Sequence, residues 1–185
     1  SVHYSFRPTV SLRGQKVMML IVRPNDRSGA TYNEFRNILY REGAIVVDVE
    51  SAEKHDLMMD IIQGLSHAKH MVAFETMRNV LKAHKIPLEE LVKYSTAFFD
   101  LTFGLDGRVI GGNPDLYIPI QTESEGLPEV LDAFDKALLQ HIGIVRRGDI
   151  KRFEEMYLEW KKDMGDYARK ATISTDKMIG TPIGV

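Results

Sequence analysis

Short apolar runs stand out in the first fifty residues of the chain. Residues 16–24 carry a nearly continuous apolar run that Pro24 stops, and residues 44–49 are rich in β-branched side chains. Runs of this kind are typical of strands that are buried on both faces, as in parallel sheets covered by helices. Residues 31–41 have helical spacing, and Gly43 follows as a helix stop. We predict one β-α-β unit over residues 16–50, as the end of a larger sheet, because a lone unit leaves sheet edges open.

Beyond this unit the apolar positions take the period of amphipathic helices. Ser51 is a cap residue before a predicted helix that continues to Leu81, roughly 25 to 30 residues and long for a globular protein. Asn113-Pro114 has the composition of a helix start. Two further helices are predicted over 127–145 and 150–164, and the weakly periodic tail after Ala171 is expected to be loose.

The change of period predicts the fold class and the division of the chain. An α/β portion occupies residues 1–52, and a mainly α-helical domain occupies residues 53–185. The long helices carry apolar residues on more than one face and therefore need partners. Most of that surface is interpreted as core, and the alternative is that part of it packs against a second copy of the chain.

Composition and charge exclude several classes of protein. The 185 residues are 44% apolar and 27% charged, as in an ordinary soluble globular protein. A net charge of −2 offers no basic field for nucleic acid, and no apolar stretch is long enough to span a membrane. The lack of cysteine excludes disulfides, thiolate zinc sites and a cysteine nucleophile. The start of the chain has no signal-peptide layout, and we expect a cytoplasmic protein.

Motifs for cofactor, metal and serine chemistry are weak. The glycines between residues 104 and 112 are not spaced as G-x-G-x-x-G and follow a helical segment rather than a strand. His67 and His70 lie three apart without an H-E-x-x-H arrangement, so we do not expect a metal site. One of these two histidines is expected to be half-buried and the other solvated. No G-x-S-x-G elbow is present.

Three polar residues near the ends of expected elements are left as candidates. His3 lies at a possible strand at the very start, and His67 interrupts an apolar helical stretch. Arg108 lies in an expected glycine-rich break over residues 107–112. From the pattern alone, a frayed terminus explains His3 as well as a functional role does, whereas a hydrogen-bonded core histidine and a solvated loop cation are the better explanations of His67 and Arg108.

Three separated motifs resemble the prephenate dehydrogenase family, which includes arogenate dehydrogenases. Residues 55–67 (HDLMMDIIQGLSH) resemble its H-D-x-x-M-x-x-I-Q-x-L-x-H segment. Residues 108–117 (RVIGGNPDLY) resemble R-x-x-x-x-[DN]-P-x-L-Y. Residues 3–8 (HYSFRP) and 12–17 (LRGQKV) resemble H-P-M-F-G-P followed by L-x-G-Q-x-V. The motifs follow one another in the family's order up to about residue 140.

The resemblance implies a fold, a reaction and a partner. Family members oxidise prephenate with NAD or NADP and release CO2, giving 4-hydroxyphenylpyruvate on the route to tyrosine. Residues 1–52 are then the C-terminal part of a Rossmann-like dinucleotide-binding domain, and residues 53–185 a substrate-binding domain that forms a homodimer. The glycine-rich half of the cofactor domain is absent from this sequence, so we expect a fragment or a truncated relative that is inactive alone.

The resemblance also implies roles for the three candidates. His3 takes the place of the catalytic histidine, and a neutral imidazole is a suitable base near pH 7. Arg108 takes the place of a substrate-binding arginine, whose guanidinium can hold a carboxylate through two hydrogen bonds. His67 takes the place of a histidine that lines the same anionic pocket. Tyr4 replaces a proline of the family motif and Arg7 a glycine, and both changes bear on substrate choice and activity.

Two alternatives from other functional classes stay open at the level of sequence. A chain without its cofactor cradle is also consistent with a non-catalytic dimeric binding or regulatory module that recognises prephenate-like dicarboxylates. The second alternative is a related dehydrogenase of the β-hydroxyacid type that acts on another small acid. The choices between NAD and NADP and between prephenate and arogenate are open as well.

Overall fold

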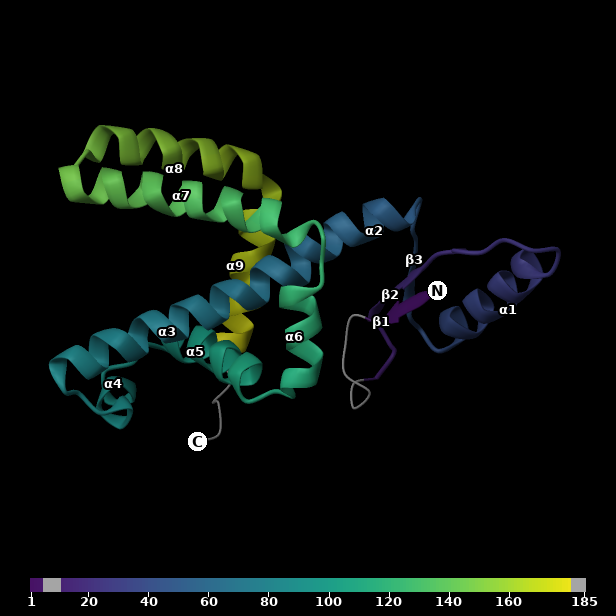
Figure 1. Cartoon of the computed structure of the whole chain (residues 1–185), viewed down its shortest axis with the longest axis horizontal. Coiled ribbons are helices and arrows are strands. Elements are labelled where there is room, and N and C mark those ends of the chain that lie inside the picture. The colour runs from purple at the N-terminus through teal and green to yellow at the C-terminus, as the bar shows by residue number, and fades with distance from the viewer. Residues whose placement is uncertain (5–10, 181–185) are drawn as a thin grey trace. The chain divides into compact units, whose positions relative to one another are not determined.

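The computed structural model describes residues 1–4 and 11–180 and divides into two compact units, Ser1–Met59 and Asp60–Val185. A small three-stranded sheet lies in the first unit, and the second is built of helices (Figure 1). This confirms the predicted fold class. The division falls at Met59, whereas the change of period had suggested residue 52.

The first unit has strands β1 (Val2–Tyr4), β2 (Lys16–Met19) and β3 (Ile45–Asp48) in the order β1-β2-β3. β1 runs antiparallel to β2, and His3 lies opposite Met18. β2 and β3 run parallel and are connected through helix α1 (Ser28–Arg41). Helix α2 (Ala52–Met59) follows β3. The β-α-β unit predicted over residues 16–50 is therefore present.

The core of this unit lies between the sheet and α1. Val17 and Met19 on β2 are buried together with Leu39 of α1 and Ala44 before β3. The prediction that both strands are buried on two faces is wrong for this unit, since Ile45, Val47 and Asp48 of β3 are exposed and only Val46 is half-buried. The reason is that one helix covers one face of the sheet, and burial in β2 therefore alternates along the strand.

A polar cluster holds α1 against β3. The Tyr32 hydroxyl donates to one carboxylate oxygen of Asp48, and Arg36 Nη2 lies 2.9 Å from the other. Burial, followed by the bond to Asp48, raises the pKa of Tyr32 to about 12. Gly43 ends the connection from α1 with a φ of +81°, a conformation that favours glycine. The helix stop predicted at this residue is confirmed.

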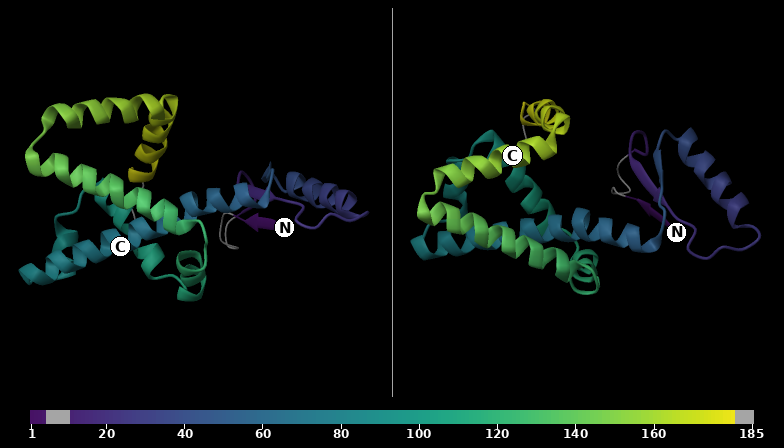
Figure 2. Two further views of the ribbon diagram at one scale, coloured as in Figure 1. Left: turned by 45° about the horizontal axis from the view of Figure 1, so that its top comes forward. Right: turned by 90° about the horizontal axis from the view of Figure 1, so that it is seen from above.

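The second unit is helical throughout its described residues. Its elements are η1 (Asp60–Leu65), α3 (Ser66–His84), α4 (Leu88–Lys93), α5 (Ala97–Ile110), α6 (Pro114–Thr122), α7 (Leu127–Arg147), α8 (Ile150–Met164) and α9 (Asp166–Ile179). Helices α7 and α8 are joined by a short turn at residues 148–149 and open away from each other from that turn (Figure 2), and α3 packs against α5. In the part of the chain that the structure describes, no helix is long and apolar enough to cross a bilayer.

Helix ends agree with the prediction where a residue with a strong capping side chain is present. The Asn113 side chain accepts a hydrogen bond from the Asp115 backbone N–H at 3.0 Å, which confirms the helix start predicted there. The expectation of a loose tail is wrong, because α9 continues to Ile179. The half-buried positions of this helix are residues 168, 171, 175 and 179, which recur at helical spacing. The tail therefore carries an amphipathic period, and three of the four positions hold small alanine or threonine side chains.

The long helix predicted from Ser51 contains a π-helical turn, η1, between α2 and α3. Gly64 in this turn lies against Leu127 of α7, and a Cβ at Gly64 would come within 2.5 Å of Leu127 Cδ1. Gln121 Nε2 donates to the Gly64 carbonyl at 3.0 Å, and the buried Asp60 accepts from the Ser124 hydroxyl. Side chains of the α6–α7 region therefore pair with a backbone carbonyl and with a buried carboxylate of the π turn.

Candidate functional site

His3 lies in the middle of β1, the strand that pairs with β2. Its Nδ1 is 3.0 Å from Nε2 of His55 on α2, and the two ring centroids are 5.2 Å apart. His55 Nδ1 in turn lies 2.9 Å from Oδ1 of Asp56. A carboxylate and two imidazoles are therefore linked in a row within the first unit.

A cavity of about 160 Å³ lies beside these groups. His3, His55 and Asp56 line it together with apolar side chains that include Met18 and Val49. Burial, and secondarily the positive charge that His55 can carry, lower the pKa of His3. An imidazole with a lowered pKa is neutral near pH 7 and can accept a proton from a ligand hydroxyl.

His67 lies in the first turn of α3 and is half-buried. Its ring meets the ring of Tyr117 from α6 nearly edge-on, with centroids 4.9 Å apart and an interplanar angle of 82°. Its Nδ1 is buried and has no hydrogen-bond partner among the described residues. Burial, followed by the charge of His70, lowers the pKa of His67. This histidine therefore also stays neutral near pH 7.

His70 is more buried than predicted and pairs with a carboxylate. Its Nδ1 lies 2.6 Å from Oδ1 of Asp106, and the two side chains are only 13% and 7% exposed. The expectation that one of the paired histidines is solvated is therefore wrong, because α5 brings a carboxylate to this face of α3. The signal was present in the sequence as an aspartate inside the apolar run of residues 101–110.

Arg108 lies in the last turn of α5 and is exposed. The glycine-rich break predicted over residues 107–112 is wrong, since α5 continues to Ile110 and ends at Gly111. Asp106 faces α3, and a residue two positions further along a helix points about 200° away. Arg108 therefore projects from the side of α5 opposite His70, and it makes no hydrogen bond or ion pair within the described residues.

The candidates fall in both units. His3 lies in the first unit, whereas His67 and Arg108 lie on α3 and α5 of the second, two helices that pack together. Tyr4 is an exposed residue at the end of β1, and Arg7 lies outside the described residues. Sequence reasoning assigned no role to three partners, His55, Asp56 and Tyr117. All three lie inside the quoted motifs, which was the signal available.

The described residues do not fit a dinucleotide phosphate group. The connection from β2 to α1, residues 20–27, contains no glycine, and Arg27 at the start of α1 makes no side-chain cap. A pyrophosphate cradle at such a turn needs glycines so that the backbone can approach the phosphates closely. No step of a reaction is therefore assigned to a cofactor held by these residues.

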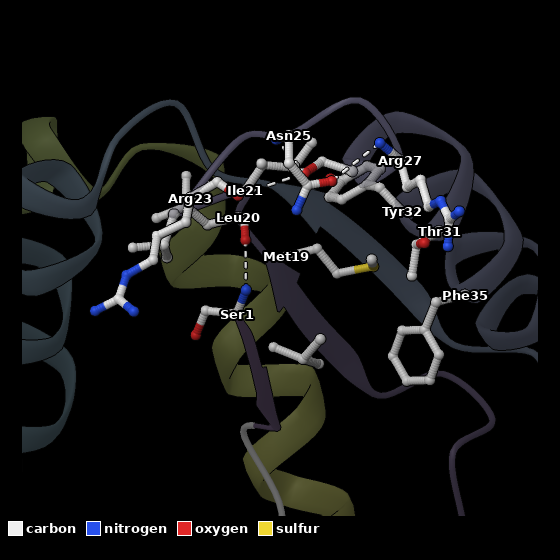
Figure 3. A pocket seen from close by; sticks show the side chains of 13 residues that line it. Ser1, Met19, Leu20, Ile21, Arg23, Asn25, Arg27, Thr31, Tyr32 and Phe35 are labelled. Atoms are coloured by element: carbon white, nitrogen blue, oxygen red, sulfur yellow. Dashed lines mark hydrogen bonds between the residues drawn. The ribbon is translucent and has the colours of Figure 1, made fainter.

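A larger hollow of about 770 Å³ lies between the end of β2 and α1 (Figure 3). Met19, Tyr32 and Phe35 contribute its apolar wall, and the Ser1 ammonium donates to the Leu20 carbonyl at 2.6 Å on its rim. Among the residues that the structure describes, no histidine or carboxylate lines this hollow. It therefore lacks the proton-transfer groups that surround the smaller cavity.

Comparison with known proteins gives one consistent family. Residues 51–159 match the family model "Prephenate dehydrogenase, dimerization domain". A "Probable arogenate/prephenate dehydrogenase" of Methanocaldococcus jannaschii is 29% identical over 177 residues, which cover 96% of this chain and 39% of the relative. A "4-amino-4-deoxyprephenate dehydrogenase" of Streptomyces pristinaespiralis is 25% identical, covering 88% of this chain and 52% of the relative.

A solved structure has a similar fold. The prephenate dehydrogenase from A. aeolicus, in complex with hydroxyphenyl propionate and NAD+, matches with a TM-score of 0.53 and 20% identity. The match covers 82% of this chain and 50% of that one. The chain thus spans about two fifths to one half of the length of these relatives. Because the family model matches more than half of its residues, the chain belongs to the prephenate dehydrogenase family and contains that family's dimerization domain.

Proposed function

We propose that this chain is the substrate-binding, proton-accepting and dimerising part of an NAD(P)-dependent prephenate or arogenate dehydrogenase. The reaction oxidises the ring carbinol with loss of CO2, which yields 4-hydroxyphenylpyruvate from prephenate on the route to tyrosine. The observation that carries this proposal is the family match over residues 51–159, which includes His55, His67 and Arg108. The described residues lack a dinucleotide cradle, so we assign to this chain proton transfer and substrate binding alone.

His3 is assigned the role of proton acceptor. Oxidation of a carbinol needs a base for the hydroxyl proton while the hydride leaves the same carbon. Burial beside the small cavity lowers the pKa of His3, and this supports a neutral imidazole with a lone pair at working pH. Decarboxylation restores an aromatic ring, so positioning of the substrate supplies most of what the side chains must contribute.

Arg108 and His67 are assigned to substrate binding. Prephenate carries two carboxylates, and a guanidinium can hold one of them through two parallel hydrogen bonds. The exposed guanidinium of Arg108, unpaired within the described residues, supports this role. His67 supports it through a buried Nδ1 without a partner and a ring held edge-on by Tyr117.

We also assign the helical unit to a homodimer. Its α7–α8 pair exposes large apolar side chains, among them Leu138, Leu139, Tyr157, Leu158 and Trp160. An exposed apolar surface of this kind favours association with another protein surface, and the family model describes a dimerization domain. Sedimentation equilibrium is expected to give a dimer at micromolar concentration, and a monomer at all concentrations would contradict this assignment.

Thermal unfolding with added ligand tests the proposed function on the chain as it stands. Prephenate or arogenate is expected to raise the unfolding temperature, since ligand at a hundred times its dissociation constant stabilises by about 2.7 kcal/mol. Succinate at the same concentration controls for dicarboxylates in general. NAD+ and NADP+ are expected to have little effect. No response to either substrate would overturn the proposal, and a large response to the nucleotides would contradict the absence of a cradle.

A further inference from the structure

The row formed by Asp56, His55 and His3 decides where each imidazole carries its proton. An ionised carboxylate only accepts hydrogen bonds, so the 2.9 Å contact with Asp56 Oδ1 requires the proton of His55 to be on Nδ1. In the neutral ring the other nitrogen, Nε2, then carries a lone pair and accepts. The 3.0 Å contact between His55 Nε2 and His3 Nδ1 therefore requires His3 to donate from Nδ1.

The proton on Nδ1 of His3 decides which atom of this ring can act as a base. With its proton on Nδ1, the neutral ring of His3 keeps its lone pair on Nε2. An imidazole in water prefers the opposite arrangement, with the proton on Nε2, so the unassisted ring would present a donor where a base is needed. The two neighbours select the proton-accepting form, as the hydrogen bond at one nitrogen generally decides the state of the other.

We propose that His55 and Asp56 are positioning residues for His3: the carboxylate orients His55, and His55 holds the proton of His3 on Nδ1, so that Nε2 is the atom that takes the substrate's hydroxyl proton. The role of His3 as a base rests on the proposed function, whereas the proton arrangement does not. In the proton step the substrate O–H bond breaks, its proton bonds to Nε2, and the electron pair stays on oxygen.

The location of the row supports this assignment. All three groups line the cavity of about 160 Å³, and the Ser1 ammonium is the one further titratable group among the described residues that line it. The His55 side chain is 23% exposed and that of Asp56 73%, so the His55 imidazole is sheltered while the carboxylate is open to water. When His3 takes up a proton, the resulting cation still donates from Nδ1 to neutral His55, and the Asp56 charge lies one ring away. The arrangement thus requires no second proton transfer.

Nitrogen NMR of the histidine rings tests the proposal without a ligand. Multiple-bond ¹H–¹⁵N spectra of the labelled chain at pH 8 are expected to show both His3 and His55 protonated on Nδ1. Asp56→Ala removes an exposed side chain and is expected to move a large share of His3 to the Nε2–H form. Glu53→Ala is the matched control, because this carboxylate lies on the same helix and its hydrogen bonds are with its own backbone and Ser51.

A second pair of variants separates proton positioning from packing. His55→Ala leaves His3 Nδ1 without its acceptor and is expected to give the Nε2–H form. His55→Gln offers a side-chain oxygen that can accept the same hydrogen bond, and it is expected to retain the Nδ1–H form at least in part. Both variants remove the imidazole, so a role confined to packing would give the same ring state in the two.

The outcomes also separate this proposal from the proposed function. Protonation of His3 on Nε2 in the unmodified chain, or a ring state unchanged by Asp56→Ala and His55→Ala, would overturn the proposal even if prephenate binds. If both rings show the expected protonation but the chain fails to bind prephenate or arogenate, the positioning role of His55 and Asp56 is upheld and the proposed dehydrogenase function is refuted. Hydroxyphenyl propionate serves as the probe of hydrogen bonding to Nε2. Asp56→Ala is expected to weaken its binding by about three- to tenfold, since one neutral hydrogen bond is affected.

Discussion

His70 of α3 and Asp106 of α5 are joined by a hydrogen bond of 2.6 Å between imidazole Nδ1 and a carboxylate oxygen. Both side chains are largely buried, so the bond ties together the two helices that carry His67 and Arg108. A buried carboxylate that loses its partner, or a buried imidazole that loses its acceptor, bears the full cost of its lost hydration. The pair therefore stabilises the part of the second unit to which we assign substrate binding.

Asp106→Ala is expected to lower the free energy of unfolding by about 2 to 3 kcal/mol, because it leaves the buried His70 nitrogen unpaired. Asp106→Asn keeps an acceptor oxygen and is expected to cost less. Urea unfolding followed by circular dichroism measures both. Asp163→Ala, at an exposed position of α8, is the control and is expected to change stability by less than about 0.5 kcal/mol. Equal effects of Asp106→Ala and this control would contradict the importance of the pair.

Two glycine-to-alanine substitutions are expected to have opposite signs. At Gly64 a new Cβ would meet the side chain of Leu127, which is 1% exposed and has little room to move. Overpacking of this kind costs about 1 to 3 kcal/mol. At Gly104, inside α5, nothing lies within 4 Å of the new Cβ. There alanine is expected to stabilise by about 0.5 to 1 kcal/mol through its higher helix propensity.

The same urea experiment measures the two glycine variants. Leu127→Val in the Gly64→Ala background removes a methylene from the crowded side chain and is expected to recover part of the loss. If Gly64→Ala is as stable as the unmodified chain, the close packing of the π turn on α7 is incorrect.

Stability is expected to fall as the pH is lowered below neutrality. Burial lowers the pKa of both His3 and His67 in the folded chain, whereas the unfolded chain keeps values near 6.5. Between the lowered values and 6.5 the unfolded chain binds more protons, so the free energy of unfolding rises with pH in this window. The contribution is complete above about pH 7 and is lost as the pH falls through the folded-state pKa values.

Chemical unfolding at a series of pH values between 5 and 8 measures this dependence. His67→Gln removes one of the two titrating groups and is expected to give a shallower slope than the unmodified chain. His84→Gln, at an exposed position at the end of α3, is the control and is expected to leave the slope unchanged. A His67→Gln chain with the unmodified slope would show that burial of His67 does not shift its pKa.

The sequence predicted those elements whose local signals are strong. The parallel β2–β3 pair, the cap at Asn113 and the limits of α8 agree with the pattern, because apolar runs, cap side chains and amphipathic periods are local properties. The π turn escaped prediction, since it depends on the packing of Gly64 against a helix more than sixty residues away. The helix at the C-terminus was missed although its half-buried positions recur at helical spacing, because three of those four positions hold alanine or threonine.

The candidate site was likewise predictable only in part. Residue types and motif spacing singled out His3, His67 and Arg108, but partners depend on tertiary structure. The contact of His3 with His55 joins residues from β1 and α2, and that of His70 with Asp106 joins α3 and α5. The sequence predicts a break at Arg108 because Gly107 precedes it. A glycine inside a helix costs only about 1 kcal/mol relative to alanine, and packing of α5 overcomes this cost.

Calorimetric titration of prephenate, or of arogenate if that is the better ligand, into the unmodified chain and its Arg108→Ala variant tests the account most directly. The loss of a charged hydrogen-bonding partner is expected to weaken binding by about ten- to a hundredfold. Arg146→Ala removes an arginine that is likewise exposed in the last turn of a helix, and it is expected to bind as the unmodified chain does. Equal affinity of the Arg108→Ala and Arg146→Ala chains for the substrate would contradict the account.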